Sequence, residues 1–325
     1  MNVGKQFAFL YGAKQSEDLI DIRNIAYNLY QGSRSVRDET VIKFLDTLHD
    51  SNYNDNWNMQ KTFVNEFASW IGTDMSAYDV DYSAGTTQSF DSFYLRHRNK
   101  KFRCYTGEYF YHLKTWMSNN IAWSFVTDTD QLQSGDALVL SFPFCDTGNF
   151  YDIDKILDIC ESLDVPVLID MAYYPLTDAP YVKFYHTCID TVTFSLSKIF
   201  PIANYRIGVR YTKKDIYDGQ KLHDDINYNN FASCYLGYEL IKKYKVNHIA
   251  STYRQKQLQV SKVFDILPSD SVIFALGNEH WNMYSRRTLL DAYKLEFAPE
   301  NFENRICLNT VYENWRLFNE LEVTL

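Results

Sequence analysis

TFSLSKIFPIANYRIGV, residues 193–209, is the stretch that decides how this chain is interpreted. Lys198 follows two hydroxyl residues, Ser195 and Ser197, at the end of a β-rich run, and Arg206 comes eight residues later, at the start of a second predicted strand over 207–211. A lysine amine becomes a nucleophile toward carbonyl groups when its site lowers its pKa or holds it against an aldehyde. Hydroxyls and an arginine beside that lysine are suitable donors to a phosphate dianion.

One amine for an aldehyde and several donors for a phosphate together predict a pyridoxal phosphate site. Asp170 ends the apolar run VPVLID, a position from which a carboxylate can keep a pyridine nitrogen protonated. Tyr173 follows three residues later and is a candidate donor to the phenolic oxygen of that cofactor. The alternative interpretation is a surface lysine, a buried arginine, two serines in a turn and an aspartate that caps a turn.

The segment DYSAGTTQSF, residues 81–90, predicts a strand, a glycine turn and a helix. Gly85, Thr86 and Thr87 would then present backbone N–H groups and hydroxyls at a helix N-terminus, where a phosphate binds well. Taken alone, the motif is explained more simply as an N-capped helix.

Length, charge and cysteine spacing exclude several classes of protein. A chain of 325 residues exceeds one small core, so two domains are expected. A net charge of −9 without a basic tract argues against nucleic-acid binding. The 6 cysteines lack C-x-x-C spacing, which predicts neither a metal site nor a disulfide framework and favours a cytoplasmic location. No apolar run approaches the length of a membrane span, so we expect no membrane partner.

The middle of the chain alternates between apolar strands and helices. Strands are predicted at 79–83, 137–142, 165–170 and 191–195, and helices at 62–71, from 86 onward and at 153–163. Continuous apolar strands separated by helices indicate an α/β architecture, with a mostly parallel sheet covered by helices on both faces. Ligands then bind beyond the carboxyl ends of the strands.

The pattern changes after about residue 214. Longer helices are predicted at 231–244 and 248–266, followed by short β-rich pieces at 271–275 and 305–309 and a last helix at 312–321. This indicates a smaller α+β domain. We therefore expect a large cofactor-binding domain over 49–214, a small domain over 215–325, and an N-terminal segment, 1–48, that packs with the small domain.

Together these motifs resemble the fold-type I pyridoxal-phosphate enzymes, and within them the class I/II aminotransferases such as the histidinol-phosphate aminotransferases. Ser-Leu-Ser-Lys198 followed by Arg206-Ile-Gly is similar to the Schiff-base lysine and the phosphate arginine of that family. Asp170-Met-Ala-Tyr173 resembles its Asp-x-Ala-Tyr signature, and Gly85-Thr-Thr resembles its phosphate-binding helix start. The resemblance implies pyridoxal phosphate as cofactor and Lys198, Asp170 and Tyr173 as catalytic residues.

Further matches extend the resemblance over nearly the whole chain. Tyr53-Asn-Asp resembles a segment whose tyrosine reaches the phosphate of the neighbouring subunit, which implies a homodimer. Tyr109, after Gly107-Glu, matches the aromatic residue that stacks on the pyridine ring, although it is also one of 26 tyrosines. Arg305 matches the arginine that binds the substrate α-carboxylate through two parallel hydrogen bonds. The alternative for Arg305 is a surface arginine on an edge strand.

The chain also departs from the family. Cys145-Asp-Thr-Gly148 stands where an Asn-Pro-x-Gly turn supplies an amide donor to the phenolic oxygen, and a thiol is a weak donor. The resemblance implies an aminotransferase that exchanges an amino group between an amino acid and a 2-oxo acid. Another reaction at Cα, decarboxylation or β-elimination, uses the same residues, and a non-catalytic protein with this fold is a third alternative.

Overall fold

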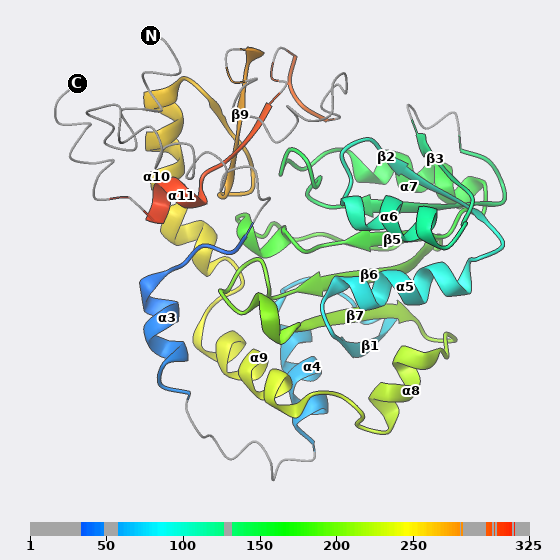
Figure 1. The fold of residues 1–325 in the computed structure, drawn as a ribbon. Coiled ribbons are helices and arrows are strands. Elements are labelled where there is room, and N and C mark those ends of the chain that lie inside the picture. The colour runs from blue at the N-terminus through cyan, green and yellow to red at the C-terminus, as the bar shows by residue number, and fades with distance from the viewer. Residues whose placement is uncertain are drawn as a thin grey trace.

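A seven-stranded sheet forms the centre of the computed structural model, which describes residues 34–48, 58–126, 132–279, 281, 297–300, 302, 304–313 and 315 (Figure 1). Its strand order is β1-β7-β6-β5-β4-β2-β3. The strands are β1 Tyr78–Ser83, β2 Lys101–Tyr105, β3 Trp123–Val126, β4 Asp136–Ser141, β5 Val167–Asp170, β6 Ile189–Ser195 and β7 Gly208–Lys213. The strands predicted from the sequence are thus confirmed, whereas β2 and β3 had no predicted counterpart.

The sheet is mostly parallel, as predicted. Strands β3, β2, β4, β5 and β6 pair in parallel, while β7 runs antiparallel to both β6 and β1. The connection from β6 to β7 contains no α-helix, whereas parallel strands are usually joined by a crossover helix. Here the chain passes only through the 3₁₀ turn η4, Ala203–Tyr205, and through Arg206, whose φ of 55° is left-handed.

Helices cover both faces of this sheet. They are α4 Met59–Trp70, α5 Thr86–Arg96, α6 Phe110–Ser118, α7 Ile153–Ser162, α8 Gly219–Asp225 and α9 Phe231–Lys243. Strand β4 shows the two-sided burial, since its alternate residues enter different apolar clusters. Ala137 and Val139 pack with Phe90 of α5 and Trp116 of α6. Leu138 and Leu140 instead pack in the larger apolar cluster on the other face.

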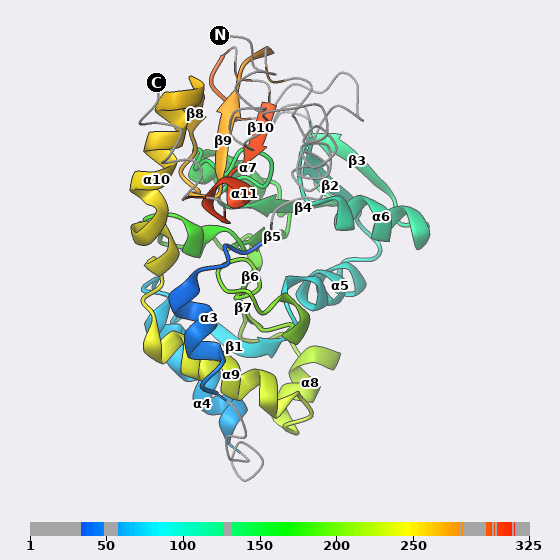
Figure 2. The ribbon, with the colours of Figure 1, turned by 60° about the vertical axis from the view of Figure 1, so that its left-hand side comes forward.

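A second, smaller sheet lies beside the first, with α10 along it (Figure 2). It is antiparallel in the order β10-β9-β8, and its elements are β8 Leu267–Pro268, β9 Phe274–Gly277, β10 Asn304–Cys307, α10 His248–Phe264 and α11 Asn309–Glu313. The predicted smaller α+β unit is therefore confirmed. Strand β9 begins three residues later than the β-rich piece expected at 271–275, because the backbone of Ser271 and Phe274 forms a turn there.

Helices α8 and α9, which follow residue 214, contact elements of the large unit. Gln220 of α8 donates to the Tyr82 carbonyl oxygen of β1 at 3.0 Å, and Gly237 of α9 packs so closely on Phe63 of α4 that a Cβ would lie 2.7 Å away. Helix α8 therefore contacts β1 of the large sheet, and α9 packs on α4, which covers that sheet. The division at 214 stays a prediction.

The described part of the N-terminal segment contacts the smaller unit. Helix α3, Glu39–Leu45, is capped by Asp38, and the other carboxylate oxygen of Asp38 accepts from the Tyr253 hydroxyl of α10 at 3.1 Å. Asn309 of α11 donates to the Arg34 carbonyl oxygen at 2.9 Å. Among all the described residues, no helix is long and apolar enough to cross a membrane.

Candidate active site

A cavity of about 540 Å³ lies where β4, β5 and β6 end at Ser141, Asp170 and Ser195. This is the carboxyl edge of the parallel strands, where ligands bind in open α/β sheets. Most of the residues that the sequence singled out line it: Thr86, Thr87, Tyr109, Asp170, Tyr173, Ser195, Ser197, Lys198 and Arg206. The fold thus brings four separate segments of the chain to one cavity.

One end of the cavity is a cluster of hydrogen-bond donors. The Arg206 guanidinium donates to Thr87 Oγ1 at 2.9 Å, directly across from Gly85. Gly85 has a φ of 75°, and a Cβ at this position would lie 2.4 Å from Arg206 Nη2, so only glycine leaves room for the guanidinium. Gly85 also serves as N-cap of α5 without a side-chain hydrogen bond, which leaves the first N–H groups of the helix without that acceptor.

The turn after β6 completes this end. Ser195 Oγ accepts the backbone N–H of Ser197 at 3.1 Å, which fixes the turn that carries Lys198. Ser197 Oγ is buried and has no hydrogen-bond partner among the described residues. A buried hydroxyl without a partner, beside a guanidinium and a helix N-terminus, fits the oxygens of a phosphate group.

Asp170 also lines the cavity, and the environment of its carboxyl favours the binding of a nearby cation. Burial raises the pKa of its carboxyl to about 7, against the opposing effects of the Ala172 N–H and of Lys198. That N–H donates to Asp170 Oδ1 at 3.0 Å. A buried carboxyl of this kind becomes ionised when a positive group approaches it, which fits a protonated pyridine nitrogen.

Lys198, Tyr173 and Tyr109 also line the cavity. Lys198 Nζ is 5.9 Å from the centroid of the Tyr173 ring, and that ring meets Phe274 edge-on at 5.3 Å. Tyr109 is the N-cap residue of α6, and its ring lies nearly parallel to that of Tyr111. The amine and both phenol rings therefore face one space of a size that suits a small aromatic cofactor.

Arg305 lies behind the cavity wall rather than in it. Its side chain is only 1% exposed, which rules out the alternative of a surface arginine. The guanidinium donates to the Cys145 carbonyl oxygen at 2.8 Å, lies 3.6 Å from an Asp146 carboxylate oxygen and is 4.6 Å from the centroid of the Phe274 ring. Arg305 Nε and Nη2 have no hydrogen-bond partner among the described residues.

Tyr53 lies outside the described residues, so its part in the site stays a prediction. The sequence interpretation missed Ser141, which lines the cavity, and Glu108, which is hydrogen-bonded to it. The sequence did offer a signal for Glu108, because it lies directly before Tyr109, a predicted site residue, and a charged residue buried at such a site needs a hydrogen-bond partner. All six cysteines are buried free thiols, in agreement with the expected lack of disulfides.

Several solved structures have a similar fold. The chain is similar to an N-succinyldiaminopimelate aminotransferase from Mycobacterium tuberculosis, with a TM-score of 0.65, 14% identity, and coverage of 93% of this chain and 96% of the other. It is also similar to the histidinol-phosphate aminotransferase from Clostridium acetobutylicum, with a TM-score of 0.60, 12% identity, and coverage of 91% and 99%.

A third similar structure is the L-threonine-O-3-phosphate decarboxylase from Porphyromonas gingivalis, with a TM-score of 0.58, 14% identity, and coverage of 89% and 99%. No protein-family model and no curated sequence matches the chain. At these identities the similarity establishes the fold. The chain has the fold of the pyridoxal-phosphate-dependent transferases, as its motifs predicted.

Proposed function

We propose that this chain is a pyridoxal-phosphate-dependent aminotransferase that exchanges an amino group between an amino acid and a 2-oxo acid. One observation carries the proposal: a single cavity is lined by a lysine amine, by a buried carboxyl with a raised pKa and by a cluster of donors suited to a phosphate. Each of the three matches a different part of pyridoxal phosphate. A cavity that binds no ligand would not be expected to combine these three groups.

Each of the predicted site residues would have a separate role toward the cofactor and the substrate. Pyridoxal phosphate supplies an electron sink that stabilises negative charge at the Cα of a bound amino acid. The Lys198 amine would hold the cofactor at its aldehyde carbon and, when free, would move the Cα proton as a general base and then acid. Asp170 holds the ring nitrogen protonated, and Tyr173 offers a hydroxyl to the ring oxygen. Arg206, with the start of α5, binds the phosphate.

Substrate binding and subunit assembly complete the proposal. We assign the α-carboxylate to Arg305, whose Nε and Nη2 would each donate a hydrogen bond to it once the side chain is reached from the cavity. We also propose a homodimer in which Tyr53 completes the partner's phosphate site. Support comes from the resemblance of Tyr53-Asn-Asp to the family segment whose tyrosine reaches the neighbouring subunit. Light scattering on the purified protein tests this, and an active monomer would refute it.

The decisive experiment compares the wild type with Lys198→Ala. Wild-type protein mixed with pyridoxal phosphate should show a visible absorption band, which Lys198→Ala should lack, and the variant should lose at least about a thousandfold in transamination rate. Its unfolding should be unchanged, because Lys198 is only partly buried. With a panel of amino donors and with 2-oxoglutarate and pyruvate as acceptors, the products identify the reaction. A 2-oxo acid formed in proportion to the amino acid consumed supports the proposal, whereas carbon dioxide or ammonia indicates one of the alternatives.

A further inference from the structure

A buried pair, Glu108 and Ser141, lies at the cavity beside Cys145. The Ser141 backbone N–H donates to Glu108 Oε1 at 2.8 Å, and Ser141 Oγ lies 2.5 Å from Glu108 Oε2. Ser141 Oγ also accepts the Cys145 backbone N–H at 2.7 Å. Ser141 lines the cavity, whereas the carboxyl of Glu108 lies behind it. No role for this pair follows from the motifs in the sequence.

The protonation state of Glu108 decides where the Ser141 hydroxyl can donate. Ionised Glu108 is only an acceptor, so the Ser141 hydroxyl proton points at Oε2. When Glu108 is protonated, its Oε1 still accepts the Ser141 N–H, so the proton sits on Oε2 and is donated to Ser141 Oγ. The Cys145 N–H occupies the second lone pair of that oxygen, so the Ser141 proton must turn to the cavity.

The surroundings of Glu108 favour the protonated form. Burial raises the pKa of Glu108 to about 8, with further increases from Asp170 and Asp146, against the two hydrogen bonds from Ser141. The other titratable groups facing Glu108 in the described structure are the Cys104 thiol on β2 and the Tyr151 hydroxyl. Neither is a cation, and burial raises the pKa of both.

We propose that Glu108 directs the Ser141 hydroxyl into the cavity, where it donates to the phenolic oxygen of pyridoxal phosphate in place of the amide that Cys145 lacks. Glu108 is then a positioning residue, and Ser141 is the group that touches the cofactor. This inference rests on the proposed function, because the ligand is the cofactor named there. It explains why an acid is buried beside a cavity that already holds Asp170.

The test measures the dissociation constant of pyridoxal phosphate for the wild type and for Glu108→Gln from about pH 6.5 to about pH 9.5. Glutamine stays neutral, accepts from the Ser141 N–H and donates to Ser141 Oγ, so it copies protonated Glu108 at every pH. The wild type should match Glu108→Gln at the low end and bind about fivefold more weakly at the high end, the effect of one net hydrogen bond. Ser141→Ala should already bind about fivefold more weakly at the low end.

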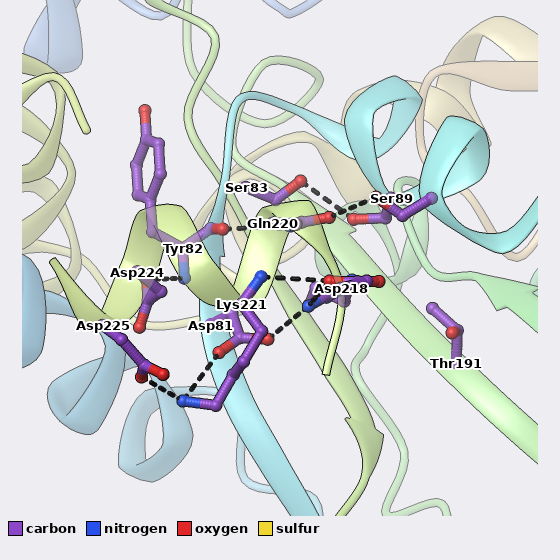
Figure 3. Close-up of polar contacts among 12 residues, drawn as sticks. Asp81, Tyr82, Ser83, Ser89, Thr191, Asp218, Gln220, Lys221, Asp224 and Asp225 are labelled. Carbon is purple, nitrogen blue, oxygen red and sulfur yellow. Dashed lines mark hydrogen bonds and ion pairs between the residues drawn. The ribbon is translucent and has the colours of Figure 1, made fainter. Parts of the chain in front are cut away.

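A readout without cofactor shows whether Glu108 titrates. Because its pKa is raised, the folded protein keeps a proton that the unfolded chain releases, so the free energy of unfolding falls as pH rises from about 4.5 to about 8. Glu108→Gln should flatten that decline. The matched control is Asp224→Asn, another buried acid, which accepts the Tyr82 N–H on β1 and has a pKa raised to about 6 by burial (Figure 3). It should flatten the decline too, but leave the pH dependence of cofactor binding unchanged.

The outcomes separate the two proposals. If the wild type binds no pyridoxal phosphate, both fail. If it binds, and Glu108→Gln follows the wild type at every pH, the role of Glu108 is refuted while the proposed function stands. If Glu108→Gln does not fold, Ser141→Ala decides, since unchanged affinity in that variant at low pH also refutes the inference.

Discussion

Two groups of carboxyls in this protein differ in the hydrogen-bond donors that they meet. In the first, at β1, β7 and α8, the fully buried Arg210 donates to Asp81 at 2.6 Å and to Asp218 at 2.7 Å. Figure 3 shows Asp81 and Asp218 there beside Lys221, whose backbone N–H also donates to Asp218. In the partly buried Asp218 the bonds from Arg210 lower the pKa to about 2 against the effect of burial, whereas in the fully buried Asp81 burial keeps the pKa raised despite Arg210.

In the second group, at the cavity, the carboxyls are bonded to uncharged donors. Asp170 accepts from a backbone N–H and Glu108 from Ser141, and burial raises the pKa of both. The difference indicates different purposes. Carboxyls that meet a guanidinium inside the protein hold its elements together, whereas carboxyls buried without one lower its stability until a ligand arrives.

Breaking the paired group should have the largest effect on stability. Arg210→Met leaves the buried Asp81 without its guanidinium partner, while Asp218 keeps Arg96, and this should lower the free energy of unfolding by about 3–5 kcal/mol. Urea unfolding at neutral pH measures it. Lys43→Met, at an exposed ion pair with Glu39, is the control and should leave the midpoint where it is. A loss in Arg210→Met no larger than in this control would contradict the distinction between the groups.

Neutralising the unpaired group should do the reverse. Because the pKa of Asp170 is raised to about 7, ionisation costs stability as pH rises from about 4 through 7, so Asp170→Asn should stabilise the cofactor-free protein at pH 8. We expect a gain of about 2–4 kcal/mol, which shrinks to nothing at about pH 4. Urea unfolding at both pH values checks the sign. The same variant should bind pyridoxal phosphate more weakly, and a loss of stability at pH 8 would show that Asp170 is paired after all.

The smallest effect is expected at Gly85, and it tests the proposed phosphate site. Gly85→Ala puts a Cβ at a positive φ and against the Arg206 guanidinium, which should cost about 1–2 kcal/mol in unfolding and weaken cofactor binding. Gly72→Ala is the matched control, since Gly72 has a φ of 69° but nothing within 4 Å of the added Cβ. It should lower stability alone. Equal cofactor affinity in the two variants would separate Gly85 from the phosphate site.

Local patterns were enough to predict much of the site. Lys198 and Arg206 were found because a lysine beside hydroxyls at a strand end is an unusual grouping, and Asp170 because it ends an apolar strand. Strand and helix periodicity likewise predicted β4, α7 and β5. Short polar-bounded strands such as β3 carried no such pattern. The direction of β7 was also missed, since it depends on the left-handed turn at Arg206.

The sequence by itself determined the α/β class and singled out a lysine, an aspartate and an arginine that line the cavity, because period, composition and spacing are local properties of the chain. Only the tertiary structure decided what depends on packing between distant segments. It placed Arg305 behind Cys145, gave Asp81 a guanidinium that Asp170 lacks, and joined Glu108 to Ser141 at the cavity. Burial and hydrogen-bond partners set the charge of a carboxyl, and neither can be read from its neighbours in sequence.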